Sequence, residues 1–191
     1  MSDYLEYLNP TRTILDEAIL YSSDVEAAKE ILISGMKNGG TVFFCGNGGS
    51  AADAQHWAAE LVGRFRVNGK ALPAHALTVD TSAITAIGND FDFSSIFSRQ
   101  LEAFAKSTDI LIGISTSGNS LNVVKAMEKA HELGIKTIGI TGGDGGQMRN
   151  LSECCVVVPS FSTEVIQHAH ATVGHYLMGM VEQALREDKS L

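Results

Sequence analysis

Five short apolar runs divide the chain from residue 41 onward, and segments of helical spacing lie between them. The runs are nearly continuous in hydrophobicity, whereas a strand with one face in water alternates apolar and polar residues. Strands buried on both faces are typical of a parallel sheet covered by helices. The pattern therefore predicts strands at residues 41–45, 75–79, 110–114, 137–140 and 155–158.

Apolar residues three or four positions apart predict helices around and between these strands. The alternation predicts a doubly wound α/β fold, in which a five-stranded parallel sheet is flanked by helices and extra helices lie at the N- and C-terminal ends. The last helix has more apolar surface than one sheet face needs, so we expect part of it to contact another subunit. The predicted helices span about residues 11–21, 24–37, 50–65, 94–105, 119–133 and 163–185.

The composition limits the function without changing the predicted fold. The 191 residues carry a net charge of -8, which argues against broad nucleic-acid binding because that needs a basic surface. A small phosphate remains an acceptable ligand, since backbone N–H groups and hydroxyls can hold it in a local pocket. No apolar stretch is long enough to cross a membrane, and residues 1–10 do not resemble a signal peptide. We therefore expect a cytoplasmic protein in which Cys45, Cys154 and Cys155 are buried thiols.

The first predicted strand ends in a glycine-rich turn that opens a helix. Glycines let the backbone approach a ligand, and free N–H groups at a helix start favour an anion. Gly46, Gly48 and Ala51 also satisfy the dinucleotide pattern G-x-G-x-x-A, so a nicotinamide-dependent oxidoreductase is one alternative. That pattern needs an acidic residue about 20 positions later, and Asp80 is too far along the chain. A tight turn without a ligand is another alternative. The candidate ligand contacts in this turn are Asn47, Gly48, Gly49 and Ser50.

A second turn, after the third predicted strand, is rich in hydroxyls. In doubly wound sheets, ligands bind at the carboxyl edge of the strands, near the point where the strand order reverses. We expect one of Ser117, Asn119 and Ser120 to cap the following helix, but a cap uses only one of the four hydroxyls. The turn therefore predicts a phosphate site, while the lack of a P-loop lysine argues against a nucleotide triphosphatase. Its four hydroxyl residues are Ser115, Thr116, Ser117 and Ser120.

Ionisable residues cluster on two of the predicted helices. His56 and Glu60 are four positions apart, which places them on one helix face, where they can bind a divalent metal or act as an acid beside a base. An incidental pair on a solvated face is the alternative. Three of the six histidines, His168, His170 and His175, lie on the last helix. His170 and His175 are either histidines bonded to backbone at the edge of the core or ligands, and His175 with His56 and Glu60 would suit zinc.

Several motifs, in order along the chain, resemble one known family. They are FCGNGGSAADAQHWAAELVGRF, TAIGNDFDFSSIFSRQ, GISTSGNSLNVVKA, TGGDGGQM and IQHAH, with His175 eight residues after Gln167. These segments are similar to those of the phosphoheptose isomerases, which belong to the wider sugar-isomerase (SIS) domain family. The resemblance covers about residues 40–182. It implies a single SIS domain over residues 1–191, in which residues 1–39 pack on the core and on neighbouring subunits of a homotetramer.

The resemblance also implies a reaction and a set of site residues. It implies isomerisation of sedoheptulose 7-phosphate to D-glycero-D-manno-heptose 7-phosphate through an enediol, for heptose biosynthesis, with Glu60 and His175 transferring the proton. One zinc ion per subunit would be held by His56, Glu60, Gln167 and His175. Besides the two turns, the implied substrate contacts are Glu60, Arg64, Asn89, Asp90 and Gln167.

The sequence departs from the family pattern at two positions of the last helix. Val165 and His168 stand where relatives carry arginine and glutamate, a difference that bears on the entrance to the site. Two further alternatives follow from the resemblance: an isomerase of another sugar phosphate, and a non-catalytic SIS-domain regulator that binds the replication initiator. The presence of His56, Glu60 and His175 favours an enzyme.

Overall fold

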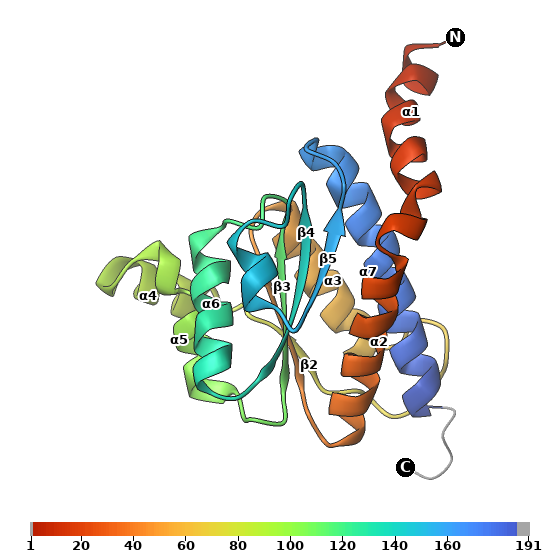
Figure 1. The fold of residues 1–191 in the computed structure, drawn as a ribbon. Coiled ribbons are helices and arrows are strands. Elements are labelled where there is room, and N and C mark those ends of the chain that lie inside the picture. The colour runs from red at the N-terminus through yellow and green to blue at the C-terminus, as the bar shows by residue number, and fades with distance from the viewer. Residues whose placement is uncertain (1, 187–191) are drawn as a thin grey trace.

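The computed structural model of the chain describes residues 2–186, and it contains one five-stranded, all-parallel sheet (Figure 1). The strands lie in the order β2-β1-β3-β4-β5. β1 lies beside β3 in register, so that Val42 is opposite Ile110 and Gly46 opposite Ile114. The predicted fold class is therefore confirmed. The strands span Val42–Gly46 (β1), Ala74–Ala76 (β2), Ile110–Ser115 (β3), Lys136–Gly142 (β4) and Cys154–Val158 (β5).

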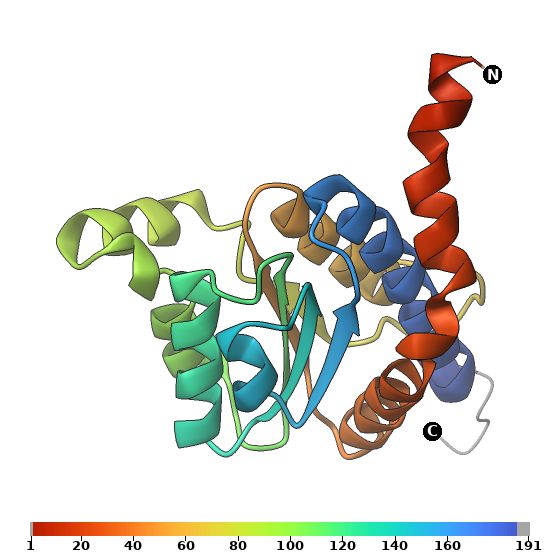
Figure 2. The ribbon, with the colours of Figure 1, turned by 45° about the horizontal axis from the view of Figure 1, so that its top comes forward.

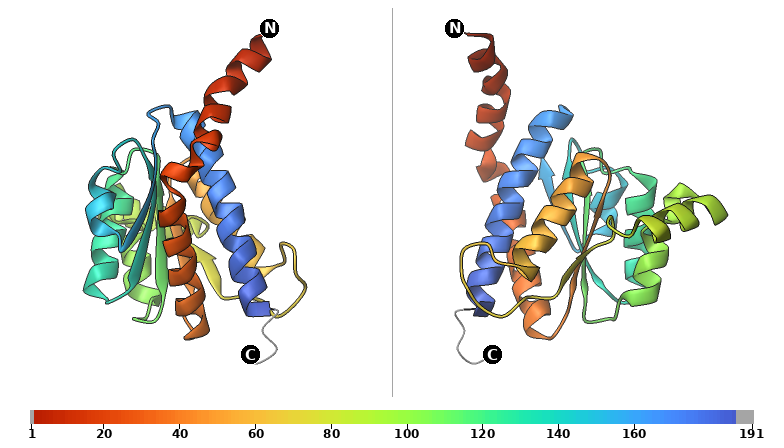
Figure 3. Two further views of the ribbon diagram at one scale, coloured as in Figure 1. Left: turned by 45° about the vertical axis from the view of Figure 1, so that its right-hand side comes forward. Right: turned by 180° about the vertical axis from the view of Figure 1, so that it is seen from behind.

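Helices cover both faces of this sheet, which explains why its strands read as continuous apolar runs (Figures 1 and 3). Alternate side chains of one strand enter two different cores: Phe44 packs with the first set of helices, whereas Phe43 and Cys45 pack with the second. The first set is α2 (Ser22–Lys37), α3 (Gly49–Val62) and α7 (Thr163–Arg186); the second is α5 (Ser98–Phe104) and α6 (Leu121–Glu132).

The N-terminal helices begin and end elsewhere than predicted. The first helix, α1, spans Asp3–Asp16 with Pro10 inside it, and a short 3₁₀ turn, η1, follows at Ala18–Leu20. The predicted break at residues 22–24 is wrong, because α2 already begins at Ser22. The predicted start at residue 11 is wrong too, because α1 begins at Asp3 and continues through Pro10.

The segment between β2 and β3 is also more divided than predicted. It forms α4 (Thr81–Asp90), a 3₁₀ turn η2 (Phe93–Ser95) and then α5, instead of one helix over residues 94–105. A further 3₁₀ turn, η3 (Gln147–Leu151), connects β4 to β5. α4 extends away from the body of the molecule, as α1 does at the opposite side (Figure 2).

Much of the apolar surface of α7 is covered by the same chain, and the expected contact with another subunit stays a prediction. Val173, Leu177 and Val181 are buried in a core shared with α2 and α3, while Ile166 packs with Ile14 of α1. Large exposed apolar side chains lie instead on α1 and η1 and around α4, among them Tyr4, Ile19, Leu20, Phe91 and Phe93.

The cysteines are free thiols within the described part of the chain. Cys45 and Cys154 are buried as expected, whereas Cys155 is partly exposed. Burial raises the pKa of the Cys154 thiol to about 11, so this group stays protonated at neutral pH. None of the described helices is long and apolar enough to span a bilayer.

Candidate active site

The two polar turns identified in the sequence lie side by side at the carboxyl edge of the sheet. β1 and β3 are neighbours, and the chain continues from β1 to β2 on one side and from β3 to β4 on the other. This is the point of the sheet where the strand order reverses, and a crevice forms there because the following helices lie on opposite faces. Asn47 of the first turn and Asn122 of α6 join the two turns through reciprocal amide hydrogen bonds of 2.8 and 2.7 Å.

The hydroxyls of the second turn face one another instead of capping α6. The Ser115 hydroxyl lies 2.9 Å from that of Ser120 and 3.4 Å from that of Ser117. Ser120 is the N-cap residue, but its side chain makes no cap hydrogen bond, so the predicted cap is wrong. Within the described residues, the amides of Ser117, Ser120 and Leu121 have no acceptor. Hydroxyls and free amides at a helix N-terminus form a suitable site for a phosphate group.

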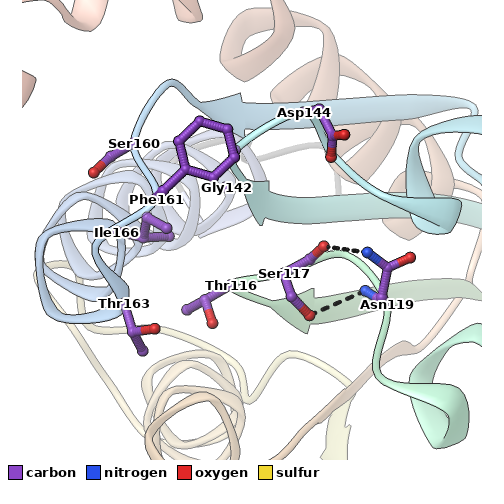
Figure 4. Close-up of a pocket in the computed structure, with 10 residues that line it drawn as sticks. Thr116, Ser117, Asn119, Gly142, Asp144, Ser160, Phe161, Thr163 and Ile166 are labelled. Atoms are coloured by element: carbon purple, nitrogen blue, oxygen red, sulfur yellow. Dashed lines mark hydrogen bonds between the residues drawn. The ribbon is translucent and has the colours of Figure 1, made fainter.

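A pocket of about 260 Å³ adjoins this second turn (Figure 4). Thr116, Ser117 and Asn119 line it on one side, and Phe161 and Asp144 line it from the loops after β5 and β4. The Ser117 carbonyl and hydroxyl both accept from Asn119, which keeps this part of the turn compact. The carboxylate of Asp144 makes the far rim of this pocket unfavourable for an anion.

The structure brings His56, Glu60 and His175 together, although α3 carries the first two and α7 the third. Glu60 Oε1 lies 3.3 Å from His56 Nε2 and 3.4 Å from His175 Nε2. The two imidazole rings are 5.0 Å apart between centroids. Glu60 is buried with a side-chain exposure of 8%, whereas His56 and His175 are 54% and 39% exposed. The carboxylate therefore lies beneath two imidazoles that a ligand can reach.

Three features of this cluster fit a divalent cation. The ligand atoms of His56, Glu60 and His175 all lie within 4.8 Å of one another. Glu60 Oε2 is buried without a hydrogen-bond partner among the described residues. His175 Nδ1 lies 2.8 Å from the Ala171 carbonyl, which only accepts hydrogen bonds, so Nδ1 carries a proton and Nε2 is the nitrogen that faces Glu60. Two imidazoles and one carboxylate are a donor set found in catalytic zinc sites.

Burial raises the pKa of the Glu60 carboxyl above its ordinary value. The imidazoles of His175 and His56 oppose this rise, and the negative charge of Glu182 adds to it. A carboxylate with a raised pKa is a stronger base than an exposed one, because its pKa lies closer to neutral pH. The environment of Glu60 therefore favours proton abstraction by this side chain.

Gln167 lies against the first turn. A Cβ atom added to Gly49 would be 2.0 Å from Gln167 Nε2, so only glycine leaves room for this amide. α7 thus contributes residues to three parts of the region: Ile166 lines the pocket, Gln167 covers the first turn, and His175 meets Glu60. The role of Gln167 as a metal ligand remains a prediction.

The other predicted site residues are not drawn into the cluster. Asn89 and Asp90 are exposed in the last turn of α4, where the Asn89 amide donates to the Asp90 carboxylate at 2.8 Å. The helix that holds them is not among those predicted from the sequence. Arg64 is exposed, next in the chain to Phe65.

The two departures from the family pattern face α1. Val165 is buried with Ile14 of α1, and His168 Nδ1 lies 3.0 Å from the Thr11 hydroxyl. His170 is also structural: it is fully buried and its Nε2 donates to the Thr141 carbonyl at 3.0 Å. Burial lowers the pKa of His170 to about 4, so this imidazole is neutral at physiological pH.

Three residues near the cluster were missed in the sequence. Asp53 lies one turn before His56, and burial raises its pKa although His56 and His175 act in the opposite direction. Its spacing of three from His56 could have identified it. Phe65 packs on His175 with ring centroids 5.5 Å apart, and Asn122 holds the first turn. Neither has a local sequence signal, because both contacts join distant parts of the chain.

Comparisons with known proteins give the same family as the motifs. A model of the SIS domain matches residues 6–142. Phosphoheptose isomerase from Clostridium acetobutylicum is 52% identical over 169 residues, which are 88% of this chain and 86% of that protein. The phosphoheptose isomerase from Aliarcobacter butzleri is 48% identical over 180 residues, which are 94% of this chain and 95% of that protein.

This chain belongs to the phosphoheptose isomerase family.

Solved structures of the family have the same fold. The phosphoheptose isomerase GmhA from Neisseria gonorrhoeae is 39% identical, with a TM-score of 0.87 over 93% of this chain and 97% of that one. The enzyme from Francisella tularensis is 35% identical, also with a TM-score of 0.87, over 96% of this chain and all of that one. The family is one of sugar-phosphate isomerases, and the acidic residue Asp80 caps α4 through a 2.9 Å bond from Ala83 N–H. The oxidoreductase alternative is thereby removed.

Replacing Gly49 by alanine should displace the Gln167 amide and lower kcat/KM by at least about tenfold, because a small misplacement of a substrate-positioning group is costly. The measurement is a double-mutant cycle of Gly49→Ala and Gln167→Ala. The double variant should be no worse than Gln167→Ala alone. Fully additive losses would show that Gly49 acts independently of Gln167.

Replacing Glu60 by glutamine should change how stability depends on pH. Because the folded state raises the Glu60 pKa, it binds this proton more tightly than the unfolded state, and ionisation destabilises the fold as pH rises through the raised pKa. The glutamine variant avoids that loss, while Asp53, His56 and His175 remain in both proteins. Thermal melts in a chelator from pH 4 to 8 should show the Tm of the variant rising relative to that of the unsubstituted protein. A relative Tm that falls with pH would contradict the raised pKa.

Proposed function

We propose that this protein interconverts sedoheptulose 7-phosphate and D-glycero-D-manno-heptose 7-phosphate, moving the carbonyl between C1 and C2 through an enediol. The observation that carries this proposal is the buried carboxylate of Glu60, which lies between two imidazoles and has one oxygen without a partner among residues 2–186. Membership of the phosphoheptose isomerase family supports the choice of substrate.

The second turn would hold the phosphate of the open-chain sugar. Its hydroxyls and free amides offer donors from several directions, and the start of α6 adds a favourable dipole. Anchoring the phosphate there fixes one end of the substrate. The reacting carbons can then extend towards the first turn, where Gln167 and the amides near Gly49 would orient the hydroxyls.

Glu60 would remove the proton from C1, and His175 would move a proton at the neighbouring oxygens. A carboxylate base must be ionised and close to the carbon acid, and the raised pKa makes Glu60 basic enough to abstract the proton. His175 presents Nε2 towards Glu60, because Nδ1 donates to the Ala171 carbonyl. The same nitrogen can accept a hydroxyl proton and return it to the other oxygen.

His56, Glu60 and His175, with Gln167 as a fourth ligand, would hold one zinc ion. When bound, zinc would supply polarisation of the carbonyl and stabilisation of negative charge on the enediolate oxygens. A carboxylate held by a cation is a weaker base, so Glu60 would not serve as ligand and base at the same moment. Glu60 Oε1 is the oxygen that faces both imidazole nitrogens.

We further propose that the protein acts as a cytoplasmic homotetramer in which Asn89 and Asp90 complete a neighbouring subunit's site. Both residues are exposed on α4, which extends from the body of the chain (Figure 2). Exposed apolar side chains on α1 and around α4 give these projecting helices surfaces to bury.

Glu60→Gln should reduce turnover of sedoheptulose 7-phosphate by at least about 10²-fold, since glutamine cannot accept the proton. The measurement is product formation at saturating substrate, with circular dichroism to establish that the variant is folded. Glu128→Gln, at an exposed position of α6, is the matched control and should retain full activity. Near-normal turnover by Glu60→Gln would show that Glu60 is not the base. Binding of the replication initiator by a protein without isomerase activity would favour the non-catalytic regulator.

Ser120→Ala should raise KM by about tenfold and leave kcat nearly unchanged, because a hydrogen bond to a charged phosphate contributes roughly 1.5–3 kcal/mol to binding. Steady-state kinetics with the sugar phosphate measure both constants. Ser34→Ala on the exposed side of α2 is the control and should alter neither. An unchanged KM for Ser120→Ala would place the phosphate elsewhere.

A further inference from the structure

A buried glutamate near the end of α7 accepts hydrogen bonds from three backbone amides of a distant loop. Glu182 is fully buried, and its Oε1 accepts from Phe65 N–H at 2.8 Å. Its Oε2 accepts from Arg66 N–H at 2.6 Å and from Val67 N–H at 2.9 Å. Burial alone would raise the pKa of Glu182, but these amides and the Arg186 guanidinium together lower it. Glu182 is therefore ionised and has partners for both oxygens.

Arg186, one turn later, holds the same loop through its carbonyl groups. Its side chain is 1% exposed and pairs with Glu182. It also donates to the Val67 carbonyl at 2.7 Å and to the Leu61 carbonyl at 2.9 Å. Two more bonds, each of 3.0 Å, reach the carbonyls of Gly63 and Lys70. The two charged side chains thus fix the end of α3 and the loop of residues 63–70, which passes the C-terminal half of α7 in the right-hand view of Figure 3.

This arrangement specifies geometry more than it stabilises the fold. A buried ion pair gains little net free energy, because the cost of removing both charges from water offsets their attraction. Seven backbone hydrogen bonds from one pair nevertheless leave the loop little freedom to move. The fixed backbone of this loop can therefore hold one of its side chains in a defined position.

Phe65 is that side chain. Its ring centroid lies 5.5 Å from that of His175, with the two planes inclined by 31°. The ring also packs on Gly179, since a Cβ atom there would be 3.3 Å from Phe65 Cε1. The imidazole of His175 is thus held from two directions, by the Ala171 carbonyl at Nδ1 and by the Phe65 ring on its face.

We propose that Glu182 and Phe65 are positioning residues for the proton-transfer site: Glu182 fixes the backbone of Phe65, and Phe65 fixes the ring plane and tautomer of His175 opposite Glu60. This inference rests on the proposed function for its kinetic consequence. Its structural consequence, the state of the His175 imidazole, does not depend on which reaction the protein performs.

The decisive variant is Phe65→Ala, because it removes the ring and leaves the Glu182 bonds to the backbone intact. We expect kcat for the sugar phosphate to fall by about tenfold while KM stays within about twofold, since the phosphate anchor is untouched. Phe65→Tyr should restore most of the lost turnover, because it keeps the ring. Glu182→Gln should also lower kcat, and the double variant should be no worse than Phe65→Ala alone, because Glu182 acts through the Phe65 ring.

Nuclear magnetic resonance of the imidazole nitrogens in metal-free protein gives a second readout. The unsubstituted protein should show His175 as one Nδ1–H tautomer, and Phe65→Ala should show a mixture of tautomers or exchange broadening. Phe104→Ala, an exposed aromatic truncation on α5, is the control and should change neither kcat nor the spectrum. An unchanged His175 spectrum in Phe65→Ala would overturn the proposal even if the protein proves not to be an isomerase. An altered spectrum without isomerase activity in the unsubstituted protein would retain the positioning role and reject the proposed reaction.

Discussion

Close contact between α7 and α3 is the constraint on which the site depends. Glu60 projects from one helix and His175 from the other, and they meet only if the two helices approach closely. Gly174 makes this approach possible, because a Cβ atom at that position would lie 2.0 Å from the Trp57 ring. Helices that pack through larger side chains are about 8–10 Å apart between axes, and a missing side chain at the crossing lowers that distance. The residue next to the contact, His175, is consequently brought over the carboxylate.

The two buried glutamates show how the same fold assigns opposite tasks to one residue type. Glu182 accepts three amide bonds and an ion pair, and its pKa is lowered. Glu60 has an oxygen without a partner, and its pKa is raised. A carboxylate whose two oxygens both accept hydrogen bonds stays ionised and holds the backbone that donates to it. A carboxylate with an oxygen that accepts no hydrogen bond keeps a higher affinity for a proton or a cation. The negative charge of Glu182 contributes to the raised pKa of Glu60, so the structural glutamate also affects the basicity of the reactive one.

The sequence predicts the sheet and the active-site turns well because their signals are local. Continuous apolar runs identify the strands, and His56 and Glu60 are four positions apart on one helix. The errors occur where distant segments decide the outcome. α1 continues through Pro10, and the hydroxyl of Ser120 bonds to Ser115 instead of capping its own helix. Glu182 and Phe65 are 117 positions apart, and no spacing rule connects residues that far apart.

The stability of α7 explains how the protein can keep a reactive carboxylate in its interior. A buried oxygen without a hydrogen-bond partner destabilises the folded state by roughly 1–3 kcal/mol, so the surrounding structure must be determined by other contacts. One such contact is the hydrogen bond from His170 to the Thr141 carbonyl of β4. Another is the packing of the Trp57 ring on Gly174, at the middle of the helix. Glu182 and Arg186 supply the third at its end. His175 lies between these anchors, so its position does not depend on its own contact with Glu60, which leaves that carboxylate free for chemistry.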